Sequence, residues 1–172
     1  MTSPTPWLIA AALALIIPSS AHAACIYNGE LDARTTIARE FTDSDWVVRG
    51  RVVSTIDNWA DGTLVDSEEP WTLYRVQIVE RFKGDPPVEV IVFTHRNSGG
   101  FYMDRPWEGP DIGGEYLLFL RPASGLPSLP DVAMDGMVVN YNCGQSKPWA
   151  EVRSTGRSEL AMLARTARSD RR

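Results

Sequence analysis

The sequence predicts a mainly β fold: a five-stranded OB-like Greek-key barrel with a short N-terminal helix and a C-terminal helix. The first observation is the segment 46–56, where apolar and polar side chains alternate and β-branched residues are frequent, as in a half-buried strand. The second is Gly50 within that segment, because a glycine inside a strand often marks a bulge or a barrel corner. The third is a series of four further strand-like segments, which suits an antiparallel sheet closed on itself.

The other elements follow from local patterns along the chain. A short helix is expected at 35–41, where Ile37, Ala38 and Phe41 share a face. A second helix is expected at 158–165, where leucines and alanines form an apolar stripe. Turns rich in glycine, proline and aspartate separate the later strands. These strands are expected at 71–82, 88–94, 115–120 and 137–143.

Three parts of the chain differ in composition. Residues 1–23 are expected to be a signal peptide, 24–150 the barrel, and 151–172 a C-terminal helix with a basic tail. The last part carries six arginines against three acidic residues, and the whole chain has a formal charge of −5, so the barrel itself is acidic. An acidic surface repels phosphate backbones, and a nucleic acid is therefore not an expected partner.

The apolar N-terminus predicts export. Its uncharged run from 7 to 18 is too short to span a bilayer, and it leads into a small-x-small cleavage pattern that ends at Ala23. The protein is therefore expected to be secreted or periplasmic and to have no transmembrane span. A lipid anchor at Cys25 is the weaker alternative, because His22 stands where an aliphatic residue is expected.

The two cysteines of the chain are Cys25 and Cys143. An even number of cysteines in an exported protein predicts a disulfide bond. A bond between these two would close nearly the whole exported chain into one loop. It would tie the first residues after the signal peptide to the last expected strand.

Four segments carry a further pattern: the opening strand 43–53, the segment 75–84 that ends in a Lys-Gly turn, the Gly-x-x-Tyr-Leu strand 113–119, and Asn142-Cys143-Gly144. In order and spacing they resemble the netrin-like domains, the group that includes the tissue inhibitors of metalloproteinases. Cys25 falls where that group has its first cysteine. The resemblance implies an OB fold and protein binding rather than catalysis.

The chain departs from that group in two places. The group usually has further cysteines after the third strand, whereas residues 97–101 contain none. The inhibitors chelate a protease zinc through the α-amine and carbonyl of an N-terminal cysteine. If Ala24 stays in front of Cys25, that amine is not free and the mechanism does not transfer directly.

The candidate partner-binding residues lie at the N-terminal cysteine and in two loops. The loop 57–70 joins the first two strands, and in the inhibitors this connection contributes to the protease contact. Tryptophan is enriched at interface hot spots, although the same side chains could instead fold over the barrel ends. The candidates are Cys25, Asp57, Trp59, Asp61, Trp71 and Trp107.

No metal, cofactor or catalytic residue is expected. The run from Asp57 to Glu68 nearly fits a calcium loop, but Trp59 stands at the third position, where an oxygen ligand is required. His95 is the only histidine after residue 23, and no Gly-x-Ser-x-Gly elbow is present.

The expected function is therefore that of a secreted, non-catalytic protein-binding module of netrin-like type. Its partner is expected to be another protein, with an extracytoplasmic protease as one candidate. Two alternatives stay open. One is a metalloprotease inhibitor that acts through the Cys25 segment, and the other is a small hydrolase that uses His95.

Overall fold

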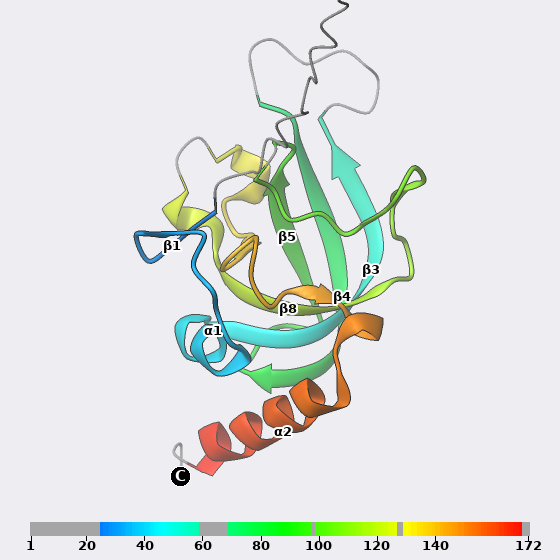
Figure 1. The fold of residues 1–172 in the computed structure, drawn as a ribbon. Helices are drawn as coiled ribbons and strands as arrows, with labels where there is room; N and C mark the ends of the chain where they lie inside the picture. The colour runs from blue at the N-terminus through cyan, green and yellow to red at the C-terminus, as the bar shows by residue number, and fades with distance from the viewer. Residues whose placement is uncertain (1–24, 59–68, 98, 127–128, 170–172) are drawn as a thin grey trace, which may run out of the picture.

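The structure is a computed structural model that describes residues 25–58, 69–97, 99–126 and 129–169 (Figure 1). Within them, five strands close into a barrel, a short helix precedes it and a longer helix follows it. This confirms the predicted fold class. The predicted signal peptide and the residues Ala24, Trp59, Asp61 and Glu68 lie outside the described residues.

The barrel strands pair in the order β8-β3-β4-β5-β9, and β9 also pairs with β8, which closes the sheet. The expectation of a wholly antiparallel sheet is wrong at one seam, because β5 and β9 run parallel where Val92 faces Met137. Five is an odd number, so a closed sheet of five strands cannot alternate in direction all the way round. The strands are β3 (Trp46–Asp57), β4 (Trp71–Lys83), β5 (Glu89–His95), β8 (Glu115–Pro122) and β9 (Met137–Val139).

β3 is the bent strand of the barrel, and it pairs with β4 along its length and with β8 along its first half. Its register against β4 shifts beside Gly50, where a Cβ atom would overlap the Val76 side chain. Val48 is buried in the barrel interior, as the alternation predicts. Val47, on the opposite face of the strand, is also buried, because α2 (Ser154–Ser169) covers the outer face there.

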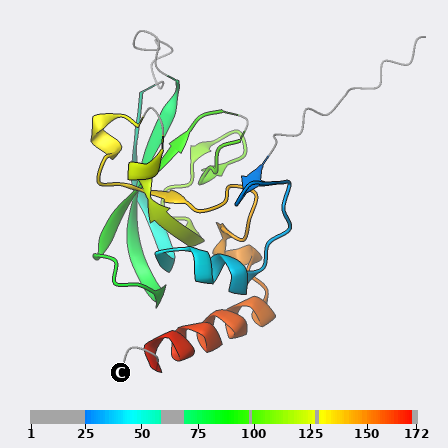
Figure 2. The same ribbon diagram turned by 90° about the vertical axis from the view of Figure 1, so that its left-hand side faces the viewer.

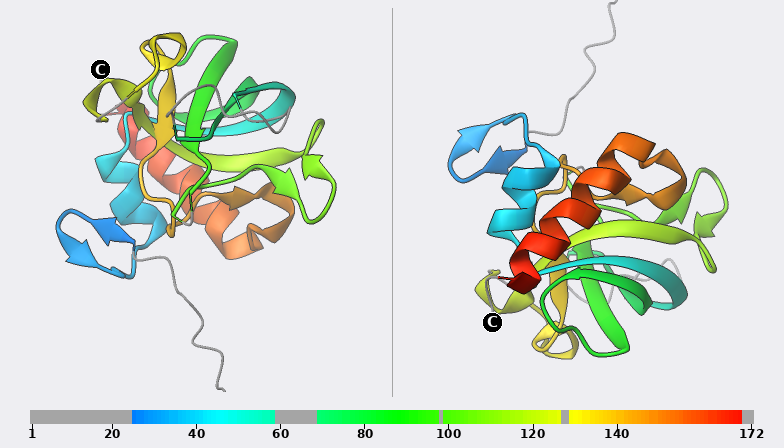
Figure 3. Two further views of the ribbon diagram at one scale, coloured as in Figure 1. Left: turned by 90° about the horizontal axis from the view of Figure 1, so that it is seen from above. Right: turned by 90° about the horizontal axis from the view of Figure 1, so that it is seen from below.

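The two helices lie together across one end of the barrel (Figures 2 and 3). α1 (Ile37–Asp43) begins after Thr36, whose hydroxyl accepts a hydrogen bond of 3.2 Å from the Arg39 amide. α2 is longer than the predicted 158–165 and buries Leu160 and Ala164. The cluster beneath the helices contains Phe41, Val47, Phe82, Leu117, Phe119, Val152, Leu160 and Ala164.

Two small hairpins and a short edge strand complete the sheets. They are β1 (Ile26–Tyr27) with β2 (Glu30–Leu31), β6 (Asp104–Arg105) with β7 (Gly109–Pro110), and β10 (Lys147–Pro148) on the edge of β8. Single 3-10 turns lie at Ala123–Gly125, Asp131–Ala133 and Trp149–Glu151.

The predicted disulfide Cys25–Cys143 is confirmed and spans 118 residues of sequence. The fifth strand, in contrast, ends at Val139 rather than at the predicted residue 143. The chain turns there instead, and the Gly144 amide donates a hydrogen bond of 3.0 Å to the Tyr141 carbonyl. In the part of the chain that the structure describes, no helix has the length and apolar character needed to cross a membrane.

Candidate functional site at the barrel rim

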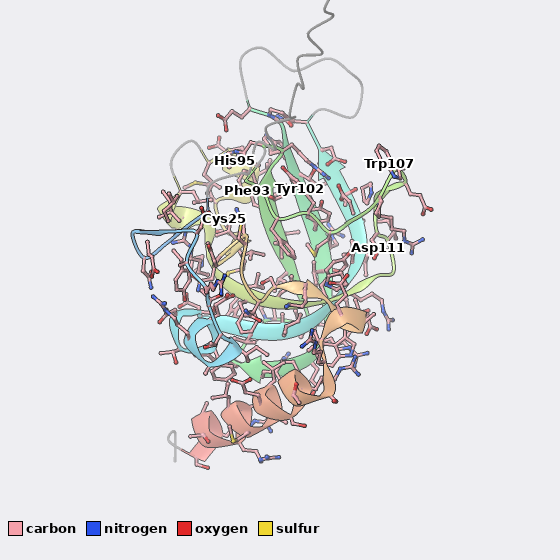
Figure 4. All side chains as sticks on the ribbon, viewed as in Figure 1. Cys25, Phe93, His95, Tyr102, Trp107 and Asp111 are labelled. Carbon is pink, nitrogen blue, oxygen red and sulfur yellow. A yellow bond between two sulfur atoms is a disulfide. The ribbon has the colours of Figure 1, made fainter. Side chains whose placement is uncertain are left out.

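A hollow of about 210 Å³ lies where the N-terminal segment meets the ends of β5 and β9. Figure 4 shows Cys25, Phe93 and His95 on this side of the molecule, with Trp107 well away from them. We call this feature the rim hollow; its lining includes Cys25, Phe93, His95, Arg121, Val138 and Asn142. It joins the N-terminal segment to the turn after β9, and the Cys25–Cys143 disulfide holds these two segments together.

Cys25 is fixed in place by Asp32 as well as by its disulfide. The Cys25 amide donates a hydrogen bond of 3.2 Å to Asp32 Oδ1, and the Asp32 amide donates one of 2.6 Å to the Cys25 carbonyl. The cysteine is 5% exposed. Both backbone groups that a chelating cysteine would use are therefore already hydrogen-bonded and buried.

Tyr27 links the N-terminal hairpin to α1 and to the turn after β9. Its hydroxyl donates a hydrogen bond of 2.6 Å to Asp43 Oδ2, and its ring packs on Tyr141 with 4.9 Å between the ring centres. Burial, together with the hydrogen bond to Asp43, raises the pKa of Tyr27 to about 12. The hydroxyl thus stays protonated and continues to donate at neutral pH.

His95 lies at the end of β5 with a carboxylate beside it. Its Nδ1 is 3.6 Å from Glu69 Oε2, and its ring meets Phe93 edge-on at 4.7 Å. Among the described residues, no serine, threonine or cysteine side chain is hydrogen-bonded to the His95 imidazole, since the Thr94 hydroxyl bonds only to the His95 carbonyl, and both cysteines are in the disulfide. A nucleophilic mechanism needs such a residue within reach of the imidazole.

A buried polar network holds the segment after His95 onto the barrel. Arg96 forms an ion pair with Asp104 and donates hydrogen bonds to Thr72 Oγ1 at 2.7 Å and to the Tyr74 hydroxyl at 3.0 Å. Tyr74 in turn donates to Asp104 Oδ1 at 2.6 Å. Burial and this hydrogen bond raise the pKa of Tyr74 above its ordinary value.

Sequence reasoning missed this network, because Arg96 and Asp104 lie in an irregular segment without periodicity. Asp57, predicted as a partner-binding residue, is connected to it, since its carboxylate accepts a hydrogen bond from the Thr72 hydroxyl. The network therefore gives Asp57 a role in joining β3 to β4.

The other candidate residues do not gather at one place. Trp71 pairs with His95 in the β4–β5 ladder and is half-buried, with its ring 6.4 Å from that of Phe93. Trp107 lies on the far side of the barrel and is fully exposed. Trp59 and Asp61 are outside the described residues, so their roles stay predictions.

The hairpin that carries Trp107 is fixed at its base. Arg105 donates a hydrogen bond of 2.5 Å to Asp111 Oδ1, and the Tyr116 hydroxyl donates one of 3.0 Å to Asp111 Oδ2. Trp107 itself has a φ of 67°, in the left-handed region that bulky residues rarely adopt. A rigid turn thus presents a large apolar ring to solvent in a strained conformation.

Charged side chains on the sheet surface are largely paired. Arg49 and Arg51 of β3 both bind Glu115 of β8, with Arg51 Nη2 2.5 Å from Glu115 Oε1. Hydrogen bonds from Arg51 and Arg49 lower the pKa of Glu115. In the described residues, no three histidine, cysteine, aspartate or glutamate side chains group closely enough to hold a metal ion.

Neither a protein-family model nor a curated protein matches the sequence. The site is therefore interpreted from its own geometry and chemistry.

Proposed function

We propose that this protein is an exported, non-catalytic protein-binding module of netrin-like type. The observation that carries the proposal is Trp107, which is fully exposed at the tip of the β6–β7 hairpin. Its left-handed backbone costs about 1 kcal/mol, and its side chain contributes no burial to the fold. An exposed tryptophan on a fixed turn is the kind of residue that anchors an interface.

The architecture supports the netrin-like part of the proposal. An OB-like barrel is the fold that the resemblance implies, and the barrel here has its N-terminal cysteine joined to the turn after the last strand. The disulfide also suits an oxidising compartment, as export requires. The family itself, the signal peptide and the identity of the partner stay part of the proposal.

The inhibitor alternative is disfavoured by the arrangement around Cys25. Zinc chelation would require the Cys25 amide nitrogen and carbonyl oxygen to leave Asp32, and it would require the buried cysteine to become accessible. The structure therefore favours contact through side chains of the loops over contact through the cysteine backbone.

The hydrolase alternative has one favourable observation, the His95–Glu69 pair. A pair of this kind can orient an imidazole base, but catalysis by the covalent route also needs a nucleophile. A His95→Gln variant tests this alternative. If the wild type hydrolyses model esters or peptides and the variant does not, the protein is an enzyme rather than a non-catalytic binding module.

The binding proposal is tested by capture of partners on the immobilised mature protein. The wild type, Trp107→Ala and Met162→Ala are exposed to the extracytoplasmic proteins of the source organism. Met162 is a matched control, because it is an exposed apolar residue on α2, away from the hairpin. We expect Trp107→Ala to weaken capture about 30-fold, as loss of a hot-spot tryptophan does, and Met162→Ala to leave it unchanged. Equal capture by all three proteins would contradict the proposal.

A further inference from the structure

We propose that the rim hollow binds the C-terminal carboxylate of a protein partner whose last side chain is apolar. The inference rests on the proposed function, since it names the chemistry by which a partner would be recognised. It concerns a part of the surface that lies away from Trp107.

The charge of the hollow is the first argument. Among the described residues, no aspartate or glutamate lines it, although the chain has 22 acidic residues and a formal charge of −5. Arg121 lines it and forms no ion pair within the described residues. Anionic ligands are thus attracted to this hollow and repelled by much of the remaining surface.

The amide side chain of Asn97 can donate a hydrogen bond to a ligand in the hollow. Asn97 Oδ1 already accepts from the Gly99 amide at 3.1 Å, which leaves its amino group for a ligand. Arginine binds carboxylates in a bidentate, charge-assisted manner. The proposal assigns no hydrogen bond to His95, whose Nδ1 lies 3.6 Å from Glu69 Oε2.

The size and apolar lining of the hollow complete the argument. Phe93 and Val138 are 2% and 6% exposed and supply apolar walls, with Leu126 beside them. A cavity of about 150 Å³ is large enough for a benzene molecule, so the 210 Å³ hollow can hold one apolar side chain with its carboxylate. Capture of a chain terminus is a known mode of peptide recognition.

Four small probes test the inference on the mature, oxidised protein. N-acetyl-leucine carries the carboxylate and an apolar side chain, N-acetyl-leucinamide lacks the charge, acetate lacks the side chain, and N-acetyl-aspartate α-amide offers an acidic side chain instead. Titrations are followed by ¹H–¹⁵N chemical shifts of the backbone amides. We expect N-acetyl-leucine to bind at least tenfold more tightly than the other three and to shift the amides of Gly99, Gly100, Val139 and Asn142.

Substitutions at two lining residues, each with a control, locate the binding. Arg121→Gln should remove the preference for the acid over the amide, whereas Arg165→Gln, on the exposed face of α2, should preserve it. Ile26 lines the hollow and is 68% exposed, so Ile26→Glu leaves the core intact and places a negative charge beside the ligand. It should weaken binding of N-acetyl-leucine at least fivefold relative to Ile26→Gln.

The outcomes separate this inference from the proposed function. Equal affinity for acid and amide, no shifts at the hollow, or a preference for the aspartate probe would overturn the inference, even if Trp107→Ala abolishes partner capture. Selective binding of N-acetyl-leucine that depends on Arg121 would support the carboxylate site, even if no partner is captured and the binding-module proposal fails.

Discussion

Cys25 and Asp32 are joined by a reciprocal pair of hydrogen bonds, one to the Asp32 carboxylate and one between the two backbones. The Cys25 amide binds the Asp32 carboxylate at 3.2 Å, and the Asp32 amide binds the Cys25 carbonyl at 2.6 Å. Together with the disulfide to Cys143, this pair holds Cys25 by both its backbone and its side chain. The N-terminal end of the barrel is therefore built as a fixed wall of the rim hollow.

This pair of hydrogen bonds predicts that two substitutions of Asp32 lower the stability by different amounts. Its φ is 50°, which asparagine tolerates and alanine does not, and alanine also lacks the acceptor for the Cys25 amide. Asp32→Ala should lower the free energy of unfolding by about 1–2 kcal/mol, and Asp32→Asn by less than about 0.5 kcal/mol. Urea denaturation of the oxidised proteins measures both free energies of unfolding. Equal losses in the two variants would contradict a stabilising role of the Cys25–Asp32 hydrogen bonds.

The buried carboxyl of Glu40 predicts a pH dependence of stability. Glu40 is 0% exposed; its Oε1 accepts hydrogen bonds from Thr35 and from the Gln145 amide, and its Oε2 has no partner in the described residues. Burial raises its pKa above 4.5. The folded state thus binds this proton more tightly than the unfolded state. The resulting stability is fully present below the unfolded pKa and is lost as pH rises through the folded pKa.

Glu40→Gln removes this titration while it keeps an acceptor for the Gln145 amide. The unfolding free energy of the wild type should therefore fall relative to Glu40→Gln between pH 4.5 and neutral pH. Exposed Glu151→Gln serves as the control and should follow the wild type. Urea denaturation at a series of pH values gives the three profiles. Parallel profiles for the wild type and Glu40→Gln would show that Glu40 is not the group responsible.

The bend of β3 predicts that a side chain at position 50 destabilises the fold. A Cβ there would overlap the Val76 side chain on β4, whereas Gly125 has no neighbour within 4 Å of such an atom. Gly50→Ala should lower the unfolding free energy by about 1–3 kcal/mol through overpacking, and Gly125→Ala should leave it nearly unchanged. Thermal unfolding followed by circular dichroism compares them. A Gly50→Ala protein as stable as the wild type would contradict the close approach of the two strands.

The ion pair of Arg96 and Asp104 predicts that a substitution of Asp104 destabilises the protein more than one of an exposed acidic residue. Their side chains are 13% and 22% exposed, and Asp104 also binds the Tyr74 hydroxyl. Asp104→Asn should cost about 2 kcal/mol, because it removes the carboxylate charge that pairs with the largely buried Arg96 guanidinium. Glu108→Gln should cost less than about 0.5 kcal/mol, since its pair with Arg105 is exposed and 3.7 Å long. Urea denaturation measures the free energy of unfolding of both variants. Similar losses would mean that Asp104 does not hold the segment after His95 onto the barrel.

The elements that could be predicted are those with a local pattern. The alternation in β3, β4 and β5, the bend at Gly50 and the stripe of α2 are all visible in the sequence. The end of β9 at Val139 could not be predicted in this way. It depends on a contact distant in sequence, because Glu40 accepts a hydrogen bond from the Gln145 amide and stabilises the turn after β9.

Other features depend on strand register. Arg49 and Arg51 share Glu115 because β3 lies beside β8, and no spacing along the chain reveals that neighbour. The rim hollow is likewise formed by four segments that meet only in the closed barrel. The sequence could therefore suggest exposed tryptophans as anchors but could not indicate a hollow bordered by Arg121.

The most direct measurement for the central proposal is photo-crosslinking in cells of the source organism. A benzoylphenylalanine is placed at position 107 in one protein and at position 162 of α2 in another, so that both probes are exposed. The account predicts a discrete crosslinked protein adduct from position 107 that is missing from position 162. No adduct at position 107, or the same adducts from both positions, would contradict the claim that Trp107 is the anchor of a protein interface.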